Sequence, residues 1–457
     1  MTRYPAYPEY KATDCDWFPR IPAHWQMDRA KWSVTSCQNG IWGSEPEGDD
    51  DLVCIRVADF DRQSLRISTK KLTQRSIAEK ERRNRLLVRG DLLLEKSGGG
   101  EQQLVGAVVE FDQTFPAVSS NFIARMVVDE GMDSRFLVYI HAHLYSGRVN
   151  FRSIKQTTGI QNLDGQAYLD EEIAYPSLEE QRAIARFLDH KTAQIDSLIA
   201  KKVALLEKLA EKRTALIGHA VTKGLDPSIR LQDSGVAWLG KVPAHWKISR
   251  IKFAARIGNG STPSRDRSDY WVDGHFPWLN SSVVNQEEVT DSDQFVTEVA
   301  LKECHLPIIQ PPAALIGITG QGKTRGMASK LSFEATINQH LAYVKPLADE
   351  IGVDYLVYLF ERAYTFLRNE SDGGGSTKGA ITCEQIANLS IPLPPISEQI
   401  AIEQHLAGTL EPIAAMRSKV SVAIDRLREY RSALITNAVT GKIDVRAFDA
   451  QSANALN

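Results

Sequence analysis

The sequence contains one long helical pattern twice, and this repeat constrains the architecture more than any other feature. In residues 178–226 leucine or isoleucine recurs every seven residues, with Lys202 breaking the series, and further leucines lie between them. This spacing is typical of one long helix that packs against a partner helix through a narrow seam. Adding 218 to each residue number gives a second copy, from residue 396 to residue 444, without a gap. The chain is therefore built twice, and we expect the two helices to pair with each other.

The apolar seam of the helix pair is predicted residue by residue. It consists of Leu188, Ile195, Leu198, Leu205, Leu209 and Leu216 in the first copy and of Leu406, Ile413, Leu427 and Leu434 in the second. Lys202 corresponds to Val420, so the seam is interrupted on one side only. A lysine at such a position can extend its ammonium group into water while its methylene stem stays at the seam.

Each helix is preceded by a module that opens with a similar short segment. The first segment is Trp17-Phe-Pro-Arg-Ile-Pro-Ala-His-Trp25, and the second is Trp238-Leu-Gly-Lys-Val-Pro-Ala-His-Trp246, 221 residues later. A basic and aromatic group follows in both copies: Arg29, Lys31 and Trp32, then Arg250, Lys252 and Phe253. His24 and His245 have no carboxylate or cysteine at a recognisable spacing. We therefore predict that these histidines serve packing or docking.

The middles of the two modules differ. Short strand-like runs bounded by Gly, Asp, Asn or Pro alternate with turns, and each module has one helical segment. The expected strands are Leu52–Val57, Asp91–Glu95, Val105–Phe111, Ile123–Val128, Phe276–Leu279, Ala313–Thr319 and Leu341–Val344, and the expected helices are Phe136–Leu144 and Val353–Leu367. Repeated ends around different middles indicate a common frame that carries two different surfaces. We expect domains at 1–175 and 227–392, helical regions at 176–226 and 393–445, and a disordered tail at 446–457.

The composition argues against several classes of protein. A net charge of −3 gives no global signal for nucleic acid or membrane, so any DNA-binding surface must be local. Five cysteines without a Cys-x-x-Cys spacing disfavour both a disulfide framework and a zinc site, and they suit a reducing cytoplasm. The N-terminal segment lacks the apolar core of a signal peptide, and no apolar run is long enough for a membrane span.

Basic and amide side chains gather in a few stretches. Residues 70–89 carry eight Lys or Arg against Glu79 and Glu81, which fits either a solvated helix face or a surface that contacts phosphates. Residues 148–162 combine Arg148, Arg152 and Lys155 with glutamine, threonine and asparagine. Arg, Lys, Gln and Asn are the side chains that reach base edges with paired hydrogen bonds.

One segment satisfies a nucleotide-binding pattern. Residues 317–324, Gly-Ile-Thr-Gly-Gln-Gly-Lys-Thr, match the phosphate-binding loop G-x-x-x-x-G-K-[ST]. Such a loop must be followed at once by a helix, whereas Gly326 lies two residues past Thr324. The preferred interpretation is a Gly-rich turn that carries polar side chains towards DNA. We identify no other catalytic, cofactor or metal-ligand constellation, which indicates a recognition protein.

Several short motifs, taken together, are specific to one family. They are Trp238-Leu-Gly-Lys-Val-Pro-Ala-His-Trp246, Gly90-Asp-Leu-Leu-Leu-Glu-Lys-Ser-Gly98, Thr336-Ile-Asn-Gln-His-Leu341 and Pro394-Pro-Ile-Ser-Glu-Gln399, the last answered by Glu179-Glu-Gln181. With the order module, helix, module, helix, the chain resembles the specificity subunit of Type I restriction–modification enzymes over nearly its whole length.

The resemblance implies two α/β (α+β) target-recognition domains and two long helices in an antiparallel intramolecular coiled coil with a pseudo-twofold repeat. Each domain would read one half of a split, asymmetric double-stranded DNA site, and the helix pair would set the spacer. Two adenine-methyltransferase subunits would bring S-adenosylmethionine, and restriction/translocase subunits would bring ATP and Mg. The chain itself would be non-catalytic, without a bound cofactor or metal, in the cytoplasm of a bacterium or archaeon.

The residues expected to contact DNA are polar and basic side chains in Gly-rich loops. They are Lys96, Arg148, Lys155, Gln156 and Gln161 in the first domain and Gln321, Lys323, Arg325, Asn338, Gln339 and Lys378 in the second. A buried structural role fits Asn338 and Gln339 equally well. Two other functions stay open: a coiled-coil scaffold that does not read DNA, and a nucleotide-binding protein built on residues 317–324.

Overall fold

The chain forms two compact units in a computed structural model. Unit 1 consists of residues 1–203 and 422–457, and unit 2 consists of residues 204–421. The structure describes residues 4–48, 51–99, 103–157, 160–320, 322–347, 350–372 and 379–448, without the side chains of residues 156 and 157. The predicted disordered tail lies outside the described residues from 449 onwards. The prediction of disorder is wrong for residues 446–448, which pack within unit 1, since the ring of Phe448 lies 5.1 Å from that of Phe187, edge to face.

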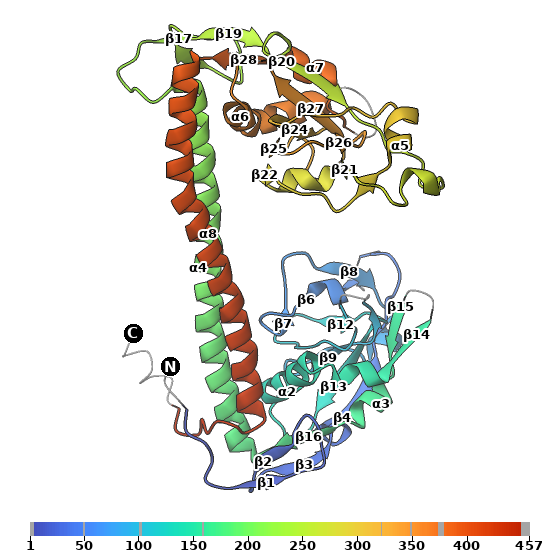
Figure 1. The fold of residues 1–457 in the computed structure, drawn as a ribbon. Helices are drawn as coiled ribbons and strands as arrows, with labels where there is room; N and C mark the ends of the chain where they lie inside the picture. The colour runs from blue at the N-terminus through green and yellow to red at the C-terminus, as the bar shows by residue number, and fades with distance from the viewer. Residues whose placement is uncertain are drawn as a thin grey trace. The chain divides into compact units, whose positions relative to one another are not determined.

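The repeated pattern forms two long helices, as predicted. They are α4 (Leu178–Lys223) and α8 (Ile396–Val439), and each is shared between the units. In unit 1 the first part of α4 lies beside the last part of α8, where Arg431 pairs with Asp196 at 3.0 Å (Figure 1). In unit 2 the last part of α4 lies beside the first part of α8, and Ile217 and Leu406 share one apolar core. The helices are therefore antiparallel in both units.

The seam of α4 differs from the predicted one at two residues. Leu188 and Ile195 are buried, but Leu198 and Leu205 are 48% and 40% exposed. A heptad seam alternates steps of four and three residues, so the position after Ile195 is Ile199, which is 7% exposed. The predicted seam continues three residues after Ile195, at Leu198, whereas the folded helix buries the residue four positions after it, Ile199. The residues between the sevenfold series are Thr192, Ile199, Leu206, Arg213 and Ala220, all buried or half-buried.

The remaining predicted seam positions face the partner helix or the core. Leu406, Ile413 and Leu434 are buried, and Leu209, Leu216 and Leu427 are half-buried. Val420 is 5% exposed, whereas its counterpart Lys202 is half-buried.

The core of unit 1 lies between a mixed sheet and the helix α2 (Ser134–Ser146) (Figure 1). Asp133 caps α2 by accepting a hydrogen bond from the backbone N–H of Phe136, and the helix buries Phe136, Leu137 and Ile140. The sheet order is β4 (Val34–Asn39), β13 (Ile123–Val128), β9 (Leu92–Glu95), β11 (Val108–Glu110), β7 (Arg66–Ile67), β6 (Phe60–Asp61). Two three-stranded sheets adjoin it: β12 (Ala117–Ser119), β5 (Asp51–Ile55), β8 (Thr73–Ser76), and β10 (Ser97–Gly98), β15 (Ile160–Leu163), β14 (Ile154–Thr157).

Unit 2 repeats this plan around the helix α6 (Val353–Asp372), which packs on β24 and β25. Its main sheet order is β20 (Ala255–Asn259), β27 (Leu341–Pro346), β24 (Ala313–Gly317), β25 (Ala328–Leu331), β22 (Glu288–Val289). A smaller sheet joins β23 (Phe295–Val296), β21 (Phe276–Leu279) and β26 (Thr336–Ile337). The central strand β24 is apolar and buried along its whole length, as expected for a strand covered on both faces.

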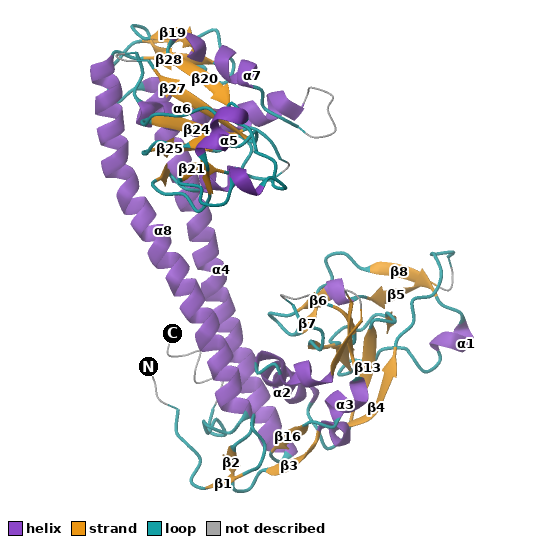
Figure 2. Cartoon of the chain, turned by 45° about the vertical axis from the view of Figure 1, so that its right-hand side comes forward, coloured by secondary structure: helices purple, strands orange, loops and turns teal. Residues whose placement is uncertain are grey.

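Short paired strands and helices complete each unit (Figure 2). The pairs are β1 (Tyr10–Ala12) with β2 (Arg20–Pro22) and β3 (Gln26–Arg29) with β16 (Glu172–Tyr175) in unit 1, then β17 (Leu231–Asp233) with β18 (Lys241–Pro243) and β19 (Lys247–Arg250) with β28 (Ser390–Leu393) in unit 2. The short helices are α1 (Glu79–Arg82), α3 (Gly165–Leu169), α5 (Glu298–Glu303) and α7 (Cys383–Asn388). Within the described ranges, no helix has the length and apolar character needed to cross a membrane.

Candidate nucleic-acid interface

Each Pro-Ala-His-Trp segment is fixed to the first turn of a long helix. In unit 1 the Glu180 carboxylate accepts a hydrogen bond from Trp25 Nε1 at 3.0 Å and contacts His24 Nε2 at 2.8 Å. In unit 2 Glu398 makes the same contacts with Trp246 and His245, at 2.9 and 2.6 Å. This geometry agrees with the packing role predicted for both histidines. The carboxylate partner could not be found from local spacing, because it lies more than 150 residues away.

The glutamine that follows each of these glutamates fixes the start of the helix that packs on the main sheet. Gln181 donates to the carbonyl of Pro176 at 3.0 Å and accepts from the backbone N–H of Asp133 at 2.9 Å, just before α2. Gln399 donates to Pro394 at 2.9 Å and accepts from Gly352 at 2.8 Å, just before α6. Each long helix therefore fixes the start of the helix that packs on the sheet of that unit, α2 or α6. The loops at the far ends of the strands are thus built on the same backbone frame in both units.

Two Asn-Gly pairs end the first strand of each main sheet. A Cβ atom at Gly40 would lie 1.9 Å from the carbonyl oxygen of Ser119, and one at Gly260 would lie 1.7 Å from that of Ile337. Only glycine allows this close approach of two backbones. In both units this contact places the turn after the first strand, at Gly40 or Gly260, against the segment that precedes the neighbouring strand β13 or β27.

The same backbone hydrogen bonds close a loop cluster in both units. In unit 1 the N–H of Lys96 donates to Phe122 at 2.8 Å, and the N–H of Leu163 donates to Lys96 at 2.7 Å. In unit 2 the N–H of Ile318 donates to His340 at 2.9 Å, and that of Ile381 donates to Ile318 at 2.8 Å. Three loops therefore converge in each unit: the one after β9 or β24, the turn before β13 or β27, and the segment ending at Leu163 or Ile381. We call these the recognition loops.

The recognition loops of unit 1 combine one ammonium group with amides and exposed apolar groups. Lys96 Nζ donates to Asn39 Oδ1 at 2.9 Å, and Ser97 donates to Asn162 at 2.5 Å. Phe122 is 49% exposed beside them. Lys96 also lines an open pocket of about 610 Å³ together with Arg85, from the basic stretch 70–89. The structure does not support a single solvated helix face for that stretch, because only Glu79–Arg82 are helical and Arg75 lies in β8, where it is 8% exposed and pairs with Glu45.

The recognition loops of unit 2 carry different side chains on the same backbone. Thr319 Oγ1 and His340 Nδ1 lie 2.6 Å apart, and the Gln339 amide contacts His340 Nε2 at 3.3 Å. The hydroxyl of Thr262 donates to Gln339 Oε1. By these backbone bonds His340 takes the place of Phe122, and the buried Ile318 takes the place of Lys96, while the polar groups of unit 2 come from the neighbouring Thr319, Gln339 and Thr262. These groups can hydrogen-bond base edges, whereas an exposed phenylalanine can only pack against them.

The structure brings together part of the predicted site of unit 1. Lys96 lies in the recognition loops, and Lys155, on the β14–β15 hairpin, is exposed and pairs with Asp164 at 2.8 Å. Gln161 is 4% exposed and accepts a hydrogen bond from the backbone N–H of Val105, so it is a buried structural support of the loops. Arg148 has a φ of 57° at the end of α2 and lies over the ring of Phe151. The side chain of Gln156 lies outside the described residues.

The predicted residues of unit 2 divide in the same way. Lys323 and Gln339 are exposed. Arg325 is 3% exposed and pairs with Asp372 at 2.7 Å, and Asn338 is 5% exposed and accepts from the backbone N–H of His340. Gln321 and Lys378 lie outside the described residues. The predicted contacts do not include Phe122, Thr262, Thr319 or His340 of these loops, and the sequence carries no signal that singles them out.

The segment that matches the nucleotide-binding pattern leads into a strand. Gly317 ends β24, and β25 pairs antiparallel with β24 from Ile316 and Ala328 onwards. Gly326 N–H donates to the Gly317 carbonyl at 2.7 Å, and Tyr364 on α6 donates to the Lys323 carbonyl at 2.9 Å. A phosphate-binding loop needs a helix at this point, so the segment is a hairpin connection.

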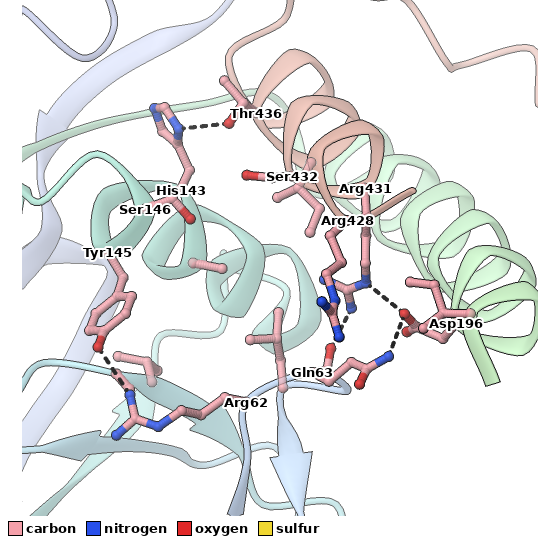
Figure 3. Close-up of a pocket in the computed structure, with 16 residues that line it drawn as sticks. Arg62, Gln63, His143, Tyr145, Ser146, Asp196, Arg428, Arg431, Ser432 and Thr436 are labelled. Carbon is pink, nitrogen blue, oxygen red and sulfur yellow. Dashed lines mark hydrogen bonds and ion pairs between the residues drawn. The ribbon is translucent and has the colours of Figure 1, made fainter. Parts of the chain in front are cut away.

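The pocket drawn in Figure 3 lies within unit 1 and measures about 400 Å³. Two of its charged lining groups pair with each other, because Asp196 accepts from Arg431 at 3.0 Å, and Asp196 also accepts from Gln63 at 2.8 Å. His143 contacts Thr436 of α8 at 3.3 Å, and burial lowers its pKa. These contacts attach the domain to α4 and α8. Among the described residues, no three His, Cys, Asp or Glu side chains gather in a group that could hold a metal ion.

Known proteins of one kind match both the sequence and the fold. A family model for the Type I restriction modification DNA specificity domain matches residues 243–409. The putative type I restriction enzyme MjaX specificity subunit of Methanocaldococcus jannaschii is 22% identical over 431 residues, covering 93% of this chain and 95% of that protein. The MjaIX specificity subunit of the same organism is 30% identical over 172 residues, covering 37% of this chain and 39% of that protein.

Two solved structures share the fold. One, described as "Structural basis underlying complex assembly and conformational transition of the type I R-M system", has a TM-score of 0.69 at 15% identity and covers 93% of this chain and 99% of that chain. The HsdS subunit from Thermoanaerobacter tengcongensis has a TM-score of 0.50 at 16% identity and covers 93% and 98%. The chain therefore carries a Type I restriction modification DNA specificity domain at residues 243–409, and over nearly its whole length it is similar to Type I restriction–modification specificity subunits.

Proposed function

We propose that this chain selects the DNA site of a Type I restriction–modification enzyme and that each unit reads one half of a bipartite, asymmetric site. The observation that carries the proposal is the pair of recognition loops. The backbone bonds of Lys96 to Phe122 and of Ile318 to His340 are the same, while the side chains differ. One scaffold with two sets of readers suits two unlike half-sites.

The helix pair sets the spacer between the half-sites in this proposal. α4 and α8 have 46 and 44 residues, so each is roughly 65–70 Å long at 1.5 Å per residue. Half-sites read from one side of the duplex lie about one helical turn, roughly 34 Å, or a multiple of it apart. A stiff antiparallel pair supports a fixed separation better than a flexible linker would.

Partner subunits supply the chemistry in this proposal. Two methyltransferase subunits dock on the repeated frame and bring S-adenosylmethionine for adenine methylation, and restriction/translocase subunits bring ATP and Mg. In this proposal the residues of this chain bind and position DNA. This role fits the internal pairing of Asp196 and Arg431 in the pocket of unit 1, which leaves those groups engaged in structure.

Sequencing of methylated adenines tests the proposal. The chain and its methyltransferase subunit are expressed together in a host without other adenine methylation. We expect one motif with two unlike halves and a fixed spacer; a continuous motif would contradict the reading of two half-sites. A gel shift separates recognition from a scaffold role, since recognition requires sequence-selective and salt-sensitive binding, whereas a scaffold would not shift DNA.

A further inference from the structure

An exposed aromatic side chain stands at the same place in both units. Phe253 and Trp32 are 65% and 63% exposed, and they are the two most exposed large apolar side chains in the described part of the chain. Each lies on a 3-10 turn that joins a strand of the frame to the first strand of the main sheet, at 30–33 and 251–253. Single exposed apolar residues are common. Their recurrence at equivalent positions of two units with different middles calls for a shared cause.

The surroundings of the two aromatics are also repeated. Lys31 Nζ lies 5.4 Å from the ring centre of Trp32, and Lys252 Nζ lies 5.4 Å from that of Phe253. Each lysine is held by the end of a short helix, through Asp170 after α3 at 2.7 Å or Asn388 of α7 at 2.9 Å. The held lysine lies against the aromatic ring, so each ring has a fixed cationic neighbour.

Buried backbone contacts fix the turns that carry these groups. The backbone N–H of Ala30 donates to Glu171 at 2.8 Å, and that of Ile251 donates to Leu389 at 3.1 Å. Ala30 and Ile251 are fully buried. A rigid turn presents an aromatic ring at a low cost in conformational entropy, which favours binding. Arg29 and Arg250, just before the turns, are exposed and add a second positive charge to each patch.

We propose that Arg29, Lys31 and Trp32 in unit 1, and Arg250, Lys252 and Phe253 in unit 2, form two equivalent docking patches for two copies of the methyltransferase subunit. The proposal rests on the proposed function and names a surface for that partner. A patch that occurs once in each unit fits one protein that binds twice. An aromatic ring beside two cations fits an apolar pocket rimmed by carboxylates.

The location of the patches favours protein over DNA. Trp32 precedes β4 and the recognition-loop residue Asn39 ends it, so the strand separates them by roughly 20 Å at 3.3 Å per residue. Phe253 and Asn259 are separated in the same way by β20. In unit 1 the Asp170 carboxylate neutralises the lysine and also pairs with Arg29 at 3.3 Å. This pairing leaves one net positive charge in the unit 1 patch, and Lys252 of unit 2 is held by the neutral amide of Asn388, so the distance from the recognition loops, rather than the charge, favours protein over DNA.

The test measures how many methyltransferase subunits the full chain binds. The chain is co-expressed with its methyltransferase subunit, and the complex is weighed by native mass spectrometry and titrated for affinity. We expect two copies on the wild type, a loss of roughly tenfold or more in affinity for one copy in Trp32→Ala or in Phe253→Ala, and no stable copy in the double variant. Trp32→Phe should restore binding, and Phe151→Ala, which removes another exposed aromatic of unit 1, should leave two copies.

Three other outcomes have distinct meanings. Two copies with unchanged affinity on the double variant would overturn the docking patches and leave the proposed function intact. Normal methyltransferase binding with weaker DNA binding and a smaller salt dependence would assign the patches to phosphates instead. A wild-type chain that binds neither the methyltransferase subunit nor DNA would overturn the proposed function itself. Circular dichroism of each variant shows whether the fold is kept.

Discussion

The indole Nε1–H of Trp25 donates a hydrogen bond to Oε1 of Glu180 at 3.0 Å across 155 residues of chain. Oε1 of Glu180 also accepts from the hydroxyl of Tyr7 at 2.7 Å, and burial raises the pKa of Tyr7, with Glu180 adding to the rise. Glu398 receives Trp246 in the same way but is more exposed. One carboxylate therefore joins the N-terminal segment to the first turn of α4.

Replacing Glu180 with alanine should destabilise unit 1. The change leaves Trp25 Nε1 and the Tyr7 hydroxyl buried without an acceptor, which costs about 2–4 kcal/mol in total. Hydrogen exchange measured by mass spectrometry should show faster exchange in residues 4–30 and no change in unit 2. Glu398→Ala is the matched control and should have a smaller effect, since the Glu398 side chain is 36% exposed and that of Glu180 is 7% exposed. An equal loss in both variants would contradict this difference.

The seam of α4 can be tested with two neighbouring residues. Ile199→Asp places a carboxylate at a position that is 7% exposed and should lower the unfolding free energy by about 3 kcal/mol or more. Leu198→Asp, at a position 48% exposed, should change it by less than about 1 kcal/mol. Urea unfolding followed by circular dichroism measures both. A larger effect at Leu198 would restore the originally predicted seam.

Single changes in the recognition loops should alter one half-site each. Lys96→Ala removes the ammonium group that contacts Asn39 in unit 1, and Gln339→Ala removes the amide that contacts His340 in unit 2. The methylated motif should relax in one half for the first variant and in the other half for the second, because in the proposed function each unit reads one half-site. The measurement is adenine-methylation sequencing. Relaxation of the same half by both variants would contradict the assignment of one half-site to each unit.

Lys323 and Arg325 should behave differently although both were predicted to contact DNA. Lys323 is exposed, so Lys323→Ala should weaken DNA binding and lower the salt slope by about one if it contacts a phosphate. Arg325 is buried and paired with Asp372, so Arg325→Ala should lower the thermal unfolding midpoint as well. Fluorescence titration at several salt concentrations and thermal melts measure the two effects. Equal melting of both variants and the wild type would show that Arg325 is not structural.

The buried His141 should make unit 1 sensitive to mild acid. Burial lowers the pKa of His141 from 6.5 to about 4, and its Nδ1 lies 2.8 Å from the Tyr168 hydroxyl. The unfolded chain therefore binds a proton that the folded chain refuses, so this stabilisation is complete above pH 6.5 and is lost as the pH falls towards 4. The loss amounts to roughly 3 kcal/mol.

The control for this prediction is His141→Gln, which keeps a polar partner for Tyr168 but does not titrate. The difference in unfolding midpoint between pH 7.5 and pH 5 should be smaller in the variant than in the wild type. Burial also lowers the pKa of His143, which therefore contributes in the same direction in both proteins and cancels in the comparison. An unchanged pH dependence would show that His141 is not responsible.

The long helices were predictable from sequence, because a period near 3.5 residues over more than forty residues has one physical cause. The seam residues that lie between the sevenfold positions were not predictable. Leucines stand at both 205 and 206, and Leu198 adjoins Ile199, so composition alone did not distinguish a step of three from a step of four. Burial in the folded pair decides it, and only the later member of each pair faces the partner.

The candidate site was predictable in its loops and not in its individual side chains. Gln161 and Arg325 belong to polar loops, but both fold beneath them and satisfy local backbone or carboxylate groups. Polarity indicates that a side chain needs a partner, and it does not say whether that partner is protein or DNA. Partners distant in sequence, such as Glu180 for His24, are invisible to local spacing.

The division of α8 between the units has a consequence for synthesis on the ribosome. Unit 2 is one continuous stretch, residues 204–421, whereas unit 1 also needs residues 422–457. A Cβ atom at Gly441 would lie 2.3 Å from Cδ of Pro22, and the backbone N–H of Asp444 donates to the carbonyl of Pro5 at 2.7 Å. The first module to be translated is thus the last to be completed, and a premature stop codon near the end of the gene would damage the beginning of the protein.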